Sequence, residues 1–316
     1  MAKARKLALL DPTSLLGEEL ALRLVQAFPQ VLHRYFHTRD SPDHLVVQVA
    51  GEASLVAPLR DLEELESAAL VVITETPAPK VGQQLLAFLN AHPQLPCLDL
   101  SCPGVLSHPR GLLPPPGATR LAFLDPALLL PQKVLVALGP LQPRRAFFTV
   151  VAPVSALGGE AVDELAAQAV ARLSGEQPKN QVLPTVTAFD ALPYREKELG
   201  ALEQQLVAQF PGLEVHLHPL LAGVFHAHCM LATVDVALVP DPPHVRQLLG
   251  KAGFTLYRRQ KPLTPSQAAS KAQALVAILG VDGNKITLWA VGDHLLLQTA
   301  AACEAAALLL ATGSPA

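Results

Sequence analysis

Short apolar runs alternate with helix-like segments along the first 130 residues of the chain. The first run, Leu7–Leu10, is followed by apolar residues at helical spacing from Leu15 to Phe28, with Thr13 or Ser14 placed to cap that helix. Strands that alternate with helices predict a parallel, doubly wound sheet. The other elements predicted in this part are strands at 33–40, 70–73, 97–101 and 121–125 and helices at 81–89 and 133–138.

A different pattern begins at Phe147. Residues 160–173 have the periodicity of an amphipathic helix, and residues 213–239 are β-rich, as in a larger, partly antiparallel sheet. The other elements predicted here are helices at 245–252 and 265–279, a strand at 284–294 and a closing helix at 296–310. The pattern predicts two domains, over 1–130 and 131–293, with the helix at 296–312 free to pack back on the first.

Composition narrows the classes of protein that fit this pattern. The 316 residues are 50% hydrophobic and 16% charged, which is typical of a globular chain with a large core. The net charge of -3, the absence of a basic block and the 4% of aromatic residues argue against a nucleic-acid partner. No uncharged apolar stretch reaches membrane-spanning length, so we expect no membrane partner.

The cysteines and the N-terminus indicate the compartment. The four cysteines form neither a Cys-x-x-Cys pair nor a disulfide framework. The N-terminal segment is basic and then apolar, but Asp11 interrupts the apolar run early, so we interpret it as a first strand, with a signal peptide as the alternative. The expected location is therefore the cytoplasm.

The sequence LALLDPTSLLGEEL (7–20) has the outline of a phosphate-binding strand–turn–helix. Such turns use glycines so that the backbone can approach a phosphate, whose charge then faces the helix N-terminus. Here Asp11 and Pro12 occupy the start of the turn, and Gly17 lies in the first turn of the helix. The segment therefore keeps the outline of a nucleotide site with altered chemistry at the corner.

Seven segments in order over nearly the whole chain resemble the aspartate-semialdehyde dehydrogenase family, and most of all its Usg-like branch. The resemblance implies a Rossmann-like, doubly wound NAD(P)-binding domain over 1–130 and a second, α+β dimerisation domain over 131–293. The segments are LLDPTSLLGEEL (9–20), DLSCPGV (99–105), DPALLLPQKVLVALGPL (125–141), VVAPVSALGGEAVDEL (150–165), AFDALPY (188–194), GVFHAHCM (223–230) and LWAVGDHLLLQTAA (288–301).

The resemblance also implies a chemistry, which can be compared position by position. The family reduces aspartyl phosphate with NADPH, using a cysteine thiolate as nucleophile, a histidine as acid/base and an arginine that clamps the substrate carboxylate. His228 matches the acid/base, but Leu128 stands at the nucleophile and Leu221 at the arginine. Ala152 stands at a pocket glutamine, and near the C-terminus Asp293 is kept. The residues after it, His294, Leu296, Leu297 and Gln298, replace asparagine, arginine, lysine and glycine.

By the same resemblance the cofactor is NADP, and its candidate ligands are Thr13, Ser14, Gly17 and Arg39. Asp11 and Ser14 replace the first two glycines of the family's turn, and only Gly17, which helix–strand packing needs, remains. We expect the Asp11 carboxylate to lie where phosphate charges belong. Two unit charges about 4 Å apart repel by roughly 4 kcal/mol at an effective dielectric near 20, or about a thousandfold in affinity.

Three functions are consistent with these residues. The first is a family member that has lost the reaction and acts by dimerisation or protein interaction, as a homodimer or a hetero-oligomer. The second is an active NAD(P)-dependent oxidoreductase with a relocated cysteine, either Cys102 or Cys229. The third is a module that binds a small ligand in the old cleft.

Two further groups of residues carry weaker hypotheses. His216 and His218 form one His-x-His pair, and His226 and His228 form another, so neighbouring strands would bring four imidazoles together, with Glu214 or Asp235 as an added metal ligand. Scattered sheet histidines are the more common case, and we predict no metal. Similarly, Arg195 and Lys197 in YREKELGALEQQL (194–206) are placed to contact an anion, although a solvated helix face explains them more simply.

Overall fold

The computed structural model describes residues 5–41, 43–102, 104–106, 110–257 and 261–312. The chain divides into two compact units, Met1–Leu124 together with Gln298–Ala316, and Asp125–Leu297. The division follows Leu124, a few residues before the boundary predicted at 130, and most of the last helix groups with the first unit.

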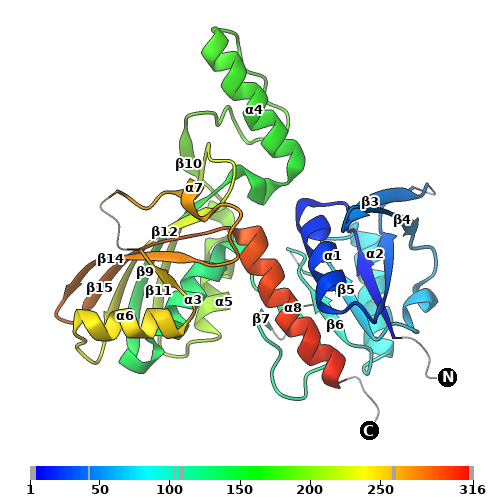
Figure 1. Ribbon diagram of the computed structural model, residues 1–316, viewed down its shortest axis with the longest axis horizontal. Coiled ribbons are helices and arrows are strands. Elements are labelled where there is room, and N and C mark those ends of the chain that lie inside the picture. Colours follow the sequence, from blue (N-terminus) through cyan, green and yellow to red (C-terminus); the bar gives the residue numbers. More distant parts are fainter. Residues whose placement is uncertain (1–4, 42, 103, 107–109, 258–260, 313–316) are drawn as a thin grey trace. The chain divides into compact units, whose positions relative to one another are not determined.

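The first unit is an eight-stranded sheet with the strand order β3-β4-β2-β1-β5-β6-β8-β7. It is drawn in the blue to blue-green part of the colour range in Figure 1. All of its strand pairs are parallel except β3–β4, as a doubly wound sheet requires. Its elements are β1 (Lys6–Leu10), α1 (Leu15–Ala27), β2 (Leu32–His37), β3 (Leu45–Val49), β4 (Glu52–Pro58), β5 (Leu70–Ile73), α2 (Pro79–Ala91), β6 (Cys97–Asp99), β7 (Arg110–Gly111) and β8 (Arg120–Phe123).

The hairpin of β3 and β4 was not predicted from the sequence. Its strands are joined at Ala50 and Gly51, both with positive φ, which is the backbone of a tight hairpin turn. The strands are half-exposed and short of aromatic residues, so their hydrophobic pattern is weak. The hairpin extends the sheet beyond β2, so that β2 and β1 are inner strands of the sheet.

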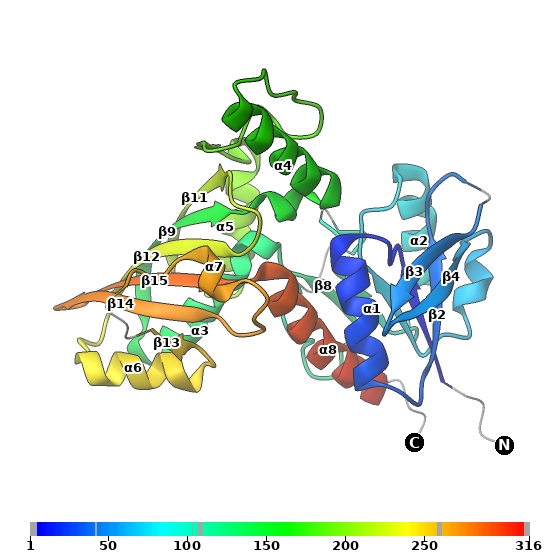
Figure 2. The ribbon, with the colours of Figure 1, turned by 45° about the horizontal axis from the view of Figure 1, so that its top comes forward.

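The second unit is a seven-stranded sheet with the order β10-β11-β9-β12-β15-β14-β13. It mixes parallel (β9–β11) and antiparallel (β9–β12, β12–β15) pairs, as predicted for 213–239. α3 packs on β9, β12 and β15 and against α6, while α4 projects from the sheet (Figure 2). Its elements are α3 (Leu129–Leu138), β9 (Pro143–Ala152), α4 (Gly159–Ser174), β10 (Ala191–Pro193), α5 (Leu199–Val207), β11 (Glu214–Ala222), β12 (His228–Val236), α6 (Pro242–Lys251), β13 (Thr255–Leu256), α7 (Pro265–Ala268), β14 (Leu275–Asp282) and β15 (Lys285–Gly292).

The helix predicted at 265–279 is wrong over most of its length. Thr264 and Gln267 form a capping box that starts α7, but the helix ends at Ala268, and Ser270 has a positive φ of 62°. The following residues form β14, which pairs antiparallel with β15. The alanine-rich sequence has helical periodicity, and strand pairing with β15 overrides it.

The last helix, α8 (His294–Thr312), is long and strongly apolar. Within the described part of the chain it alone has the length and hydropathy of a membrane span, over His294–Ala311, and 44% of that window is buried inside the protein. Core helices of globular proteins have the same composition, so this feature does not identify a membrane protein.

Candidate functional site

The predicted cofactor residues gather at the corner between β1 and α1 in the first unit. Ser14 caps α1 by accepting a hydrogen bond from the Gly17 amide at 3.0 Å. A Cβ on Gly17 would lie 2.6 Å from the Pro12 Cα and 2.7 Å from the Asp11 carbonyl oxygen. Gly17 therefore lets α1 approach the turn closely, which is the packing role predicted for it.

The Asp11 carboxylate was expected to lie over the corner, but it turns inward. The side chain is only 2% exposed and accepts hydrogen bonds from the Thr38 amide at 2.8 Å and the Thr38 hydroxyl at 2.7 Å. The Thr74 hydroxyl contacts the Leu10 and Asp11 carbonyl oxygens, both at 2.7 Å. Asp11 therefore ties the ends of β1, β2 and β5 together. The predicted repulsion of a phosphate by a facing carboxylate is wrong for this residue.

A second carboxylate, which the sequence analysis missed, lies at this corner. Glu75 follows β5 and is half-buried; burial raises its pKa most, followed by the charge of Asp11, while Arg39 and a hydrogen bond from Ser14 lower it. Arg39 in turn donates to the Thr13 hydroxyl at 3.5 Å. The sequence did carry a signal, because TETPAPK follows an apolar run whose end must meet the same sheet edge.

The carboxylate of Asp99, the last residue of β6, binds the backbone of the loop that follows. Asp99 is fully buried and accepts hydrogen bonds from the Ser101 amide (3.0 Å), the Ser101 hydroxyl (2.5 Å) and the Leu106 amide (2.6 Å). Burial raises the pKa of Asp99, and these hydrogen bonds oppose that shift. Backbone N–H groups at this edge of the sheet therefore bind protein carboxylates, where a nucleotide-binding fold directs such groups to phosphate.

In the second unit, the position that matches the family's nucleophile is buried and apolar. Asp125, 1% exposed, accepts a hydrogen bond from the Ala127 amide at 2.9 Å and pairs with the Arg195 Nη1 at 2.7 Å. Leu128 follows in the same turn and is fully buried. Arg195 also pairs with Glu198, so the solvated helix face proposed for this segment is wrong for Arg195. This arginine fixes the turn, and the turn presents no nucleophilic atom.

The position of the family's substrate clamp is apolar. Leu221 on β11 lies directly beside Ala152 on β9 in the parallel register. Both are buried in one cluster with Val154, Ala161 and Leu165. A substrate carboxylate would find no cation or amide at these two positions.

His228, the matched acid/base, lies against His294. Their rings meet edge to face with centroids 4.8 Å apart, and each residue is 3% exposed. Burial, and then His294 and Arg195, hold the pKa of His228 well below its usual range. Burial lowers the pKa of His294 to about 4, partly opposed by Asp293. Both imidazoles are therefore neutral at pH 7. From the sequence, His294 was recognised only as a histidine where the family has an asparagine, and its contact with His228 was not predicted.

Cys229 faces away from His228, because neighbours on a strand point to opposite sides. It is 4% exposed, in an apolar cluster with Leu263, Leu275 and Val291, and burial raises its pKa to about 12. Cys229 is therefore a thiol at neutral pH and no candidate nucleophile. Cys102 is exposed in the first unit, so its role stays a prediction.

The two histidine pairs of the metal hypothesis do not lie on neighbouring strands. β9 lies between β11, which carries His216 and His218, and β12, which begins at His228. The His216 imidazole donates a hydrogen bond to the Glu214 carboxylate at 3.0 Å, and its ring stacks on Phe147. Over the described ranges of the chain, no three His, Cys, Asp or Glu side chains are placed to hold a metal ion.

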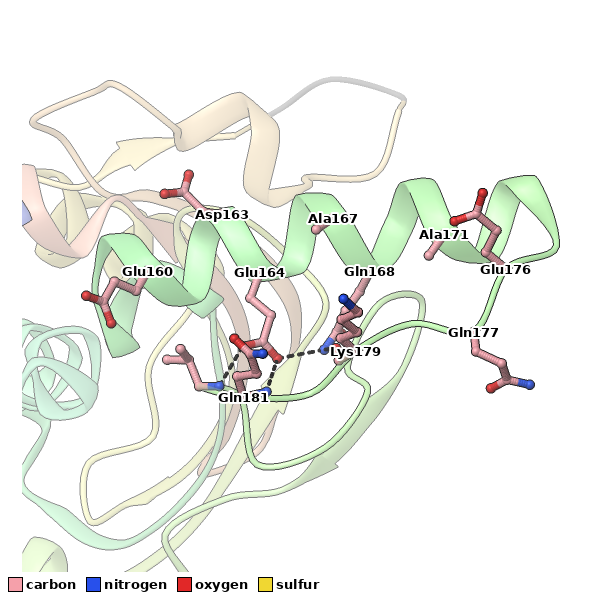
Figure 3. Close-up of a pocket in the computed structure, with 11 residues that line it drawn as sticks. Glu160, Asp163, Glu164, Ala167, Gln168, Ala171, Glu176, Gln177, Lys179 and Gln181 are labelled. Carbon is pink, nitrogen blue, oxygen red and sulfur yellow. Dashed lines mark hydrogen bonds between the residues drawn. The ribbon is translucent and has the colours of Figure 1, made fainter.

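A groove of about 660 Å³ runs along α4, between the helix and the loop that follows it (Figure 3). Its central acid, Glu164, accepts hydrogen bonds from the Gln181 and Val182 amides at 3.0 and 2.5 Å. Gln168 donates to Glu164 and accepts from the Thr187 amide. The polar side chains at the centre of this groove thus hold the loop in place.

Comparison with known proteins agrees with the resemblance. Residues 135–297 match the family described as semialdehyde dehydrogenase, dimerisation domain. A USG-1 protein homolog of Azotobacter vinelandii is 31% identical over 198 residues, which is 56% of this chain and 59% of that protein, so the match spans less than two thirds of the relative.

Solved structures show the same fold. Aspartate semialdehyde dehydrogenase II of Vibrio cholerae, complexed with ASA, superposes with a TM-score of 0.80 at 19% identity. The superposition covers 98% of this chain and 99% of that chain. A probable aspartate-semialdehyde dehydrogenase of Pseudomonas aeruginosa gives 0.78 at 20% identity, covering 94% and 97%. The predicted fold class, a Rossmann-like unit with a dimerisation unit, is confirmed. The chain belongs to the semialdehyde dehydrogenase family defined by this dimerisation domain.

Proposed function

We propose that this protein is a non-catalytic member of its family, which has lost the NADPH-dependent reduction of aspartyl phosphate and acts through dimerisation or protein interaction. The observation that carries the proposal is Leu128, fully buried where the family holds its cysteine. A thioester needs a thiolate, and a leucine side chain supplies none.

Two other losses support the same conclusion. Ala152 and Leu221 leave the substrate pocket apolar, so the substrate carboxylate would lose its bidentate partner. At the cofactor corner, carboxylates of the protein take up hydrogen-bond donors of the sheet edge. Losing one group changes the specificity of an enzyme, whereas losing the nucleophile, the clamp and the phosphate contacts removes the reaction.

An interaction role is supported by a partly exposed apolar face of the second unit's sheet. Phe147 and Leu231 are 39% and 38% exposed, and Leu231 lies between Thr149 and Trp289 in the strand register. A monomer rarely exposes a broad apolar face. The occupant we propose is a second copy of the chain, because this face belongs to the segment that matches the dimerisation domain.

α4 offers a second exposed apolar stripe within the same segment. Val162, Ala166, Val170 and Leu173 recur at helical spacing, and Val170 and Leu173 are 65% and 79% exposed. The opposite face, with Ala161 and Leu165, is already buried. The stripe is therefore available to the same second copy.

Charge placed on the apolar sheet face is expected to break the dimer. In Leu231→Glu, association would have to bury an unpaired carboxylate, so we expect the dimer dissociation constant to rise at least about a hundredfold. Sedimentation velocity at micromolar concentration would then show monomer. Val46→Glu, at a 62% exposed position of the first unit, is the matched control and should remain dimeric. A dimer unchanged by Leu231→Glu would contradict this interface.

A further inference from the structure

The strand β3 forms one edge of the first unit's sheet, and it lacks the features that protect the other sheet edges. An edge strand presents unpaired N–H and C=O groups, and proteins blunt such edges with charge, proline, bulges or very short strands. The strands at the other three edges are β7, β10 and β13. β7 and β13 have two residues each, β7 includes an arginine, and β10 has three residues and ends in Pro193.

The edge strand β3 is longer than these and entirely uncharged. Its five residues are Leu-Val-Val-Gln-Val, with no proline. Its register with β4 runs from Leu45 opposite Val56 to Val49 opposite Glu52 without a bulge. Alternate residues of an antiparallel strand direct their N–H and C=O groups away from the partner strand, so β3 presents such groups at its outer side. Among the described residues, no backbone hydrogen bond reaches β3 from outside its pair with β4.

The side chains of β3 alternate between a buried and an exposed face. Val47 and Val49 are buried, whereas Val46 and Gln48 point to the other face and are exposed. Val46 lies opposite Leu55 of β4, and both side chains are 62% exposed. An unprotected edge thus adjoins an exposed apolar pair, and this combination favours the addition of a further strand.

We propose that β3 is an interaction edge, which pairs antiparallel with β3 of a second copy of the chain. A two-fold axis at Val47 brings each Val46 opposite Gln48 of the second copy, so no like charges meet. The two strands offer each other the same row of backbone donors and acceptors, which antiparallel pairing satisfies. The contact is short, so we expect a dissociation constant on the order of 0.1 mM. It goes beyond the contact proposed on the second unit's sheet, which alone is occupied at micromolar concentration.

The test is a charge swap on β3, made in the full chain carrying Leu231→Glu so that the second unit's sheet does not contribute. Sedimentation equilibrium up to about 1 mM should show that this chain associates. Val46→Lys with Gln48→Lys places like charges directly opposite one another, so the dissociation constant should rise at least about tenfold. Val46→Glu with Gln48→Glu should have the same effect. Mixed in equal amounts, the lysine and glutamate variants should associate at least about tenfold more tightly than either does alone.

The matched control is Leu55→Lys, which places a charge on the same exposed face but on the inner strand β4. It should associate as the Leu231→Glu chain does, and a loss as large as in the β3 variants would overturn the edge pairing. A Leu231→Glu chain that stays monomeric at 1 mM, or oppositely charged variants that ignore each other, would also overturn it. Circular dichroism checks that each variant is folded.

The same series separates this inference from the proposed function. A Leu231→Glu chain that remains dimeric at micromolar concentration would contradict the contact on the second unit's sheet. The charge swap then decides whether that dimer is formed by β3, because only a β3 contact is weakened by the two like-charged variants and restored in their mixture.

Discussion

Replacing Arg195 by methionine is expected to destabilise the second unit by about 3 kcal/mol. The guanidinium pairs with Asp125 at 2.7 Å, and Asp125 is 1% exposed, so the variant leaves a buried carboxylate without its cation. Methionine keeps most of the side-chain volume. Trp289, the single tryptophan, belongs to this unit, so its fluorescence during urea unfolding reports the change.

The matched control is Arg145→Met in the same unit. Arg145 pairs with Glu214 at a similar distance, 2.8 Å, but the two side chains are 50% and 51% exposed. Exposed pairs contribute at most about 1 kcal/mol, so this loss should be small. In the double variant Asp125→Asn with Arg195→Met, the cost should be less than the sum of the single costs. Equal small losses in both single variants would show that the Asp125 pair does not fix the turn.

Acid is expected to destabilise the second unit through its buried histidine pair. His294 has a pKa of about 4 in the folded protein and about 6.5 when unfolded, so the unfolded state binds more protons between these values. Its contribution is fully present above pH 6.5, falls as the pH drops, and is lost below pH 4. The loss from pH 7.5 to pH 5 is about 2 kcal/mol for His294 alone. His228 shifts in the same direction and adds to it.

Burial is the main cause of the lowered pKa of His294. Among the charged and titratable groups around it, His226 opposes protonation and Asp293 favours it, and the His228 ring lies edge to face against it. His294→Asn removes the titration of this residue and should reduce the loss of unfolding free energy between pH 7.5 and pH 5 by its share of about 2 kcal/mol, read again from Trp289. Thr233→Ser, a substitution on β12 that removes no titratable group, is the control and should keep the pH dependence of the natural chain. A natural chain equally stable at pH 7.5 and pH 5 would contradict the buried, neutral state of the pair.

Local patterns were enough to predict the fold, but not every element. The run Leu7–Leu10 and the Ser14 cap predicted β1 and α1 because both signals lie within a few residues. The hairpin around Ala50 and the strand β14 were missed because their identity depends on pairing with β2 and β15, and their own periodicity is weak or misleading.

At the site, the sequence alone showed which functional side chains of the family are replaced, and the structure showed which contacts the replacing residues make. Leu128 and Leu221 stand at the positions of the family's nucleophile and arginine, and the sequence alone is enough to identify both replacements. The contacts of Asp11 with Thr38, Arg195 with Asp125 and His228 with His294 join residues 27, 70 and 66 positions apart, so no local pattern contains them. Glu75 was also missed, because it reaches the corner between β1 and α1 only where β5 lies beside β1 in the sheet.

The central claim is that the chain neither holds a dinucleotide nor forms a thioester. The most direct measurement is a titration of the pure protein with NADP, joined to an assay of NADPH formation from aspartate semialdehyde and phosphate in the same preparation. The account predicts no saturable binding up to millimolar NADP and no turnover above the protein-free rate. Saturation at micromolar NADP together with steady NADPH production would contradict it.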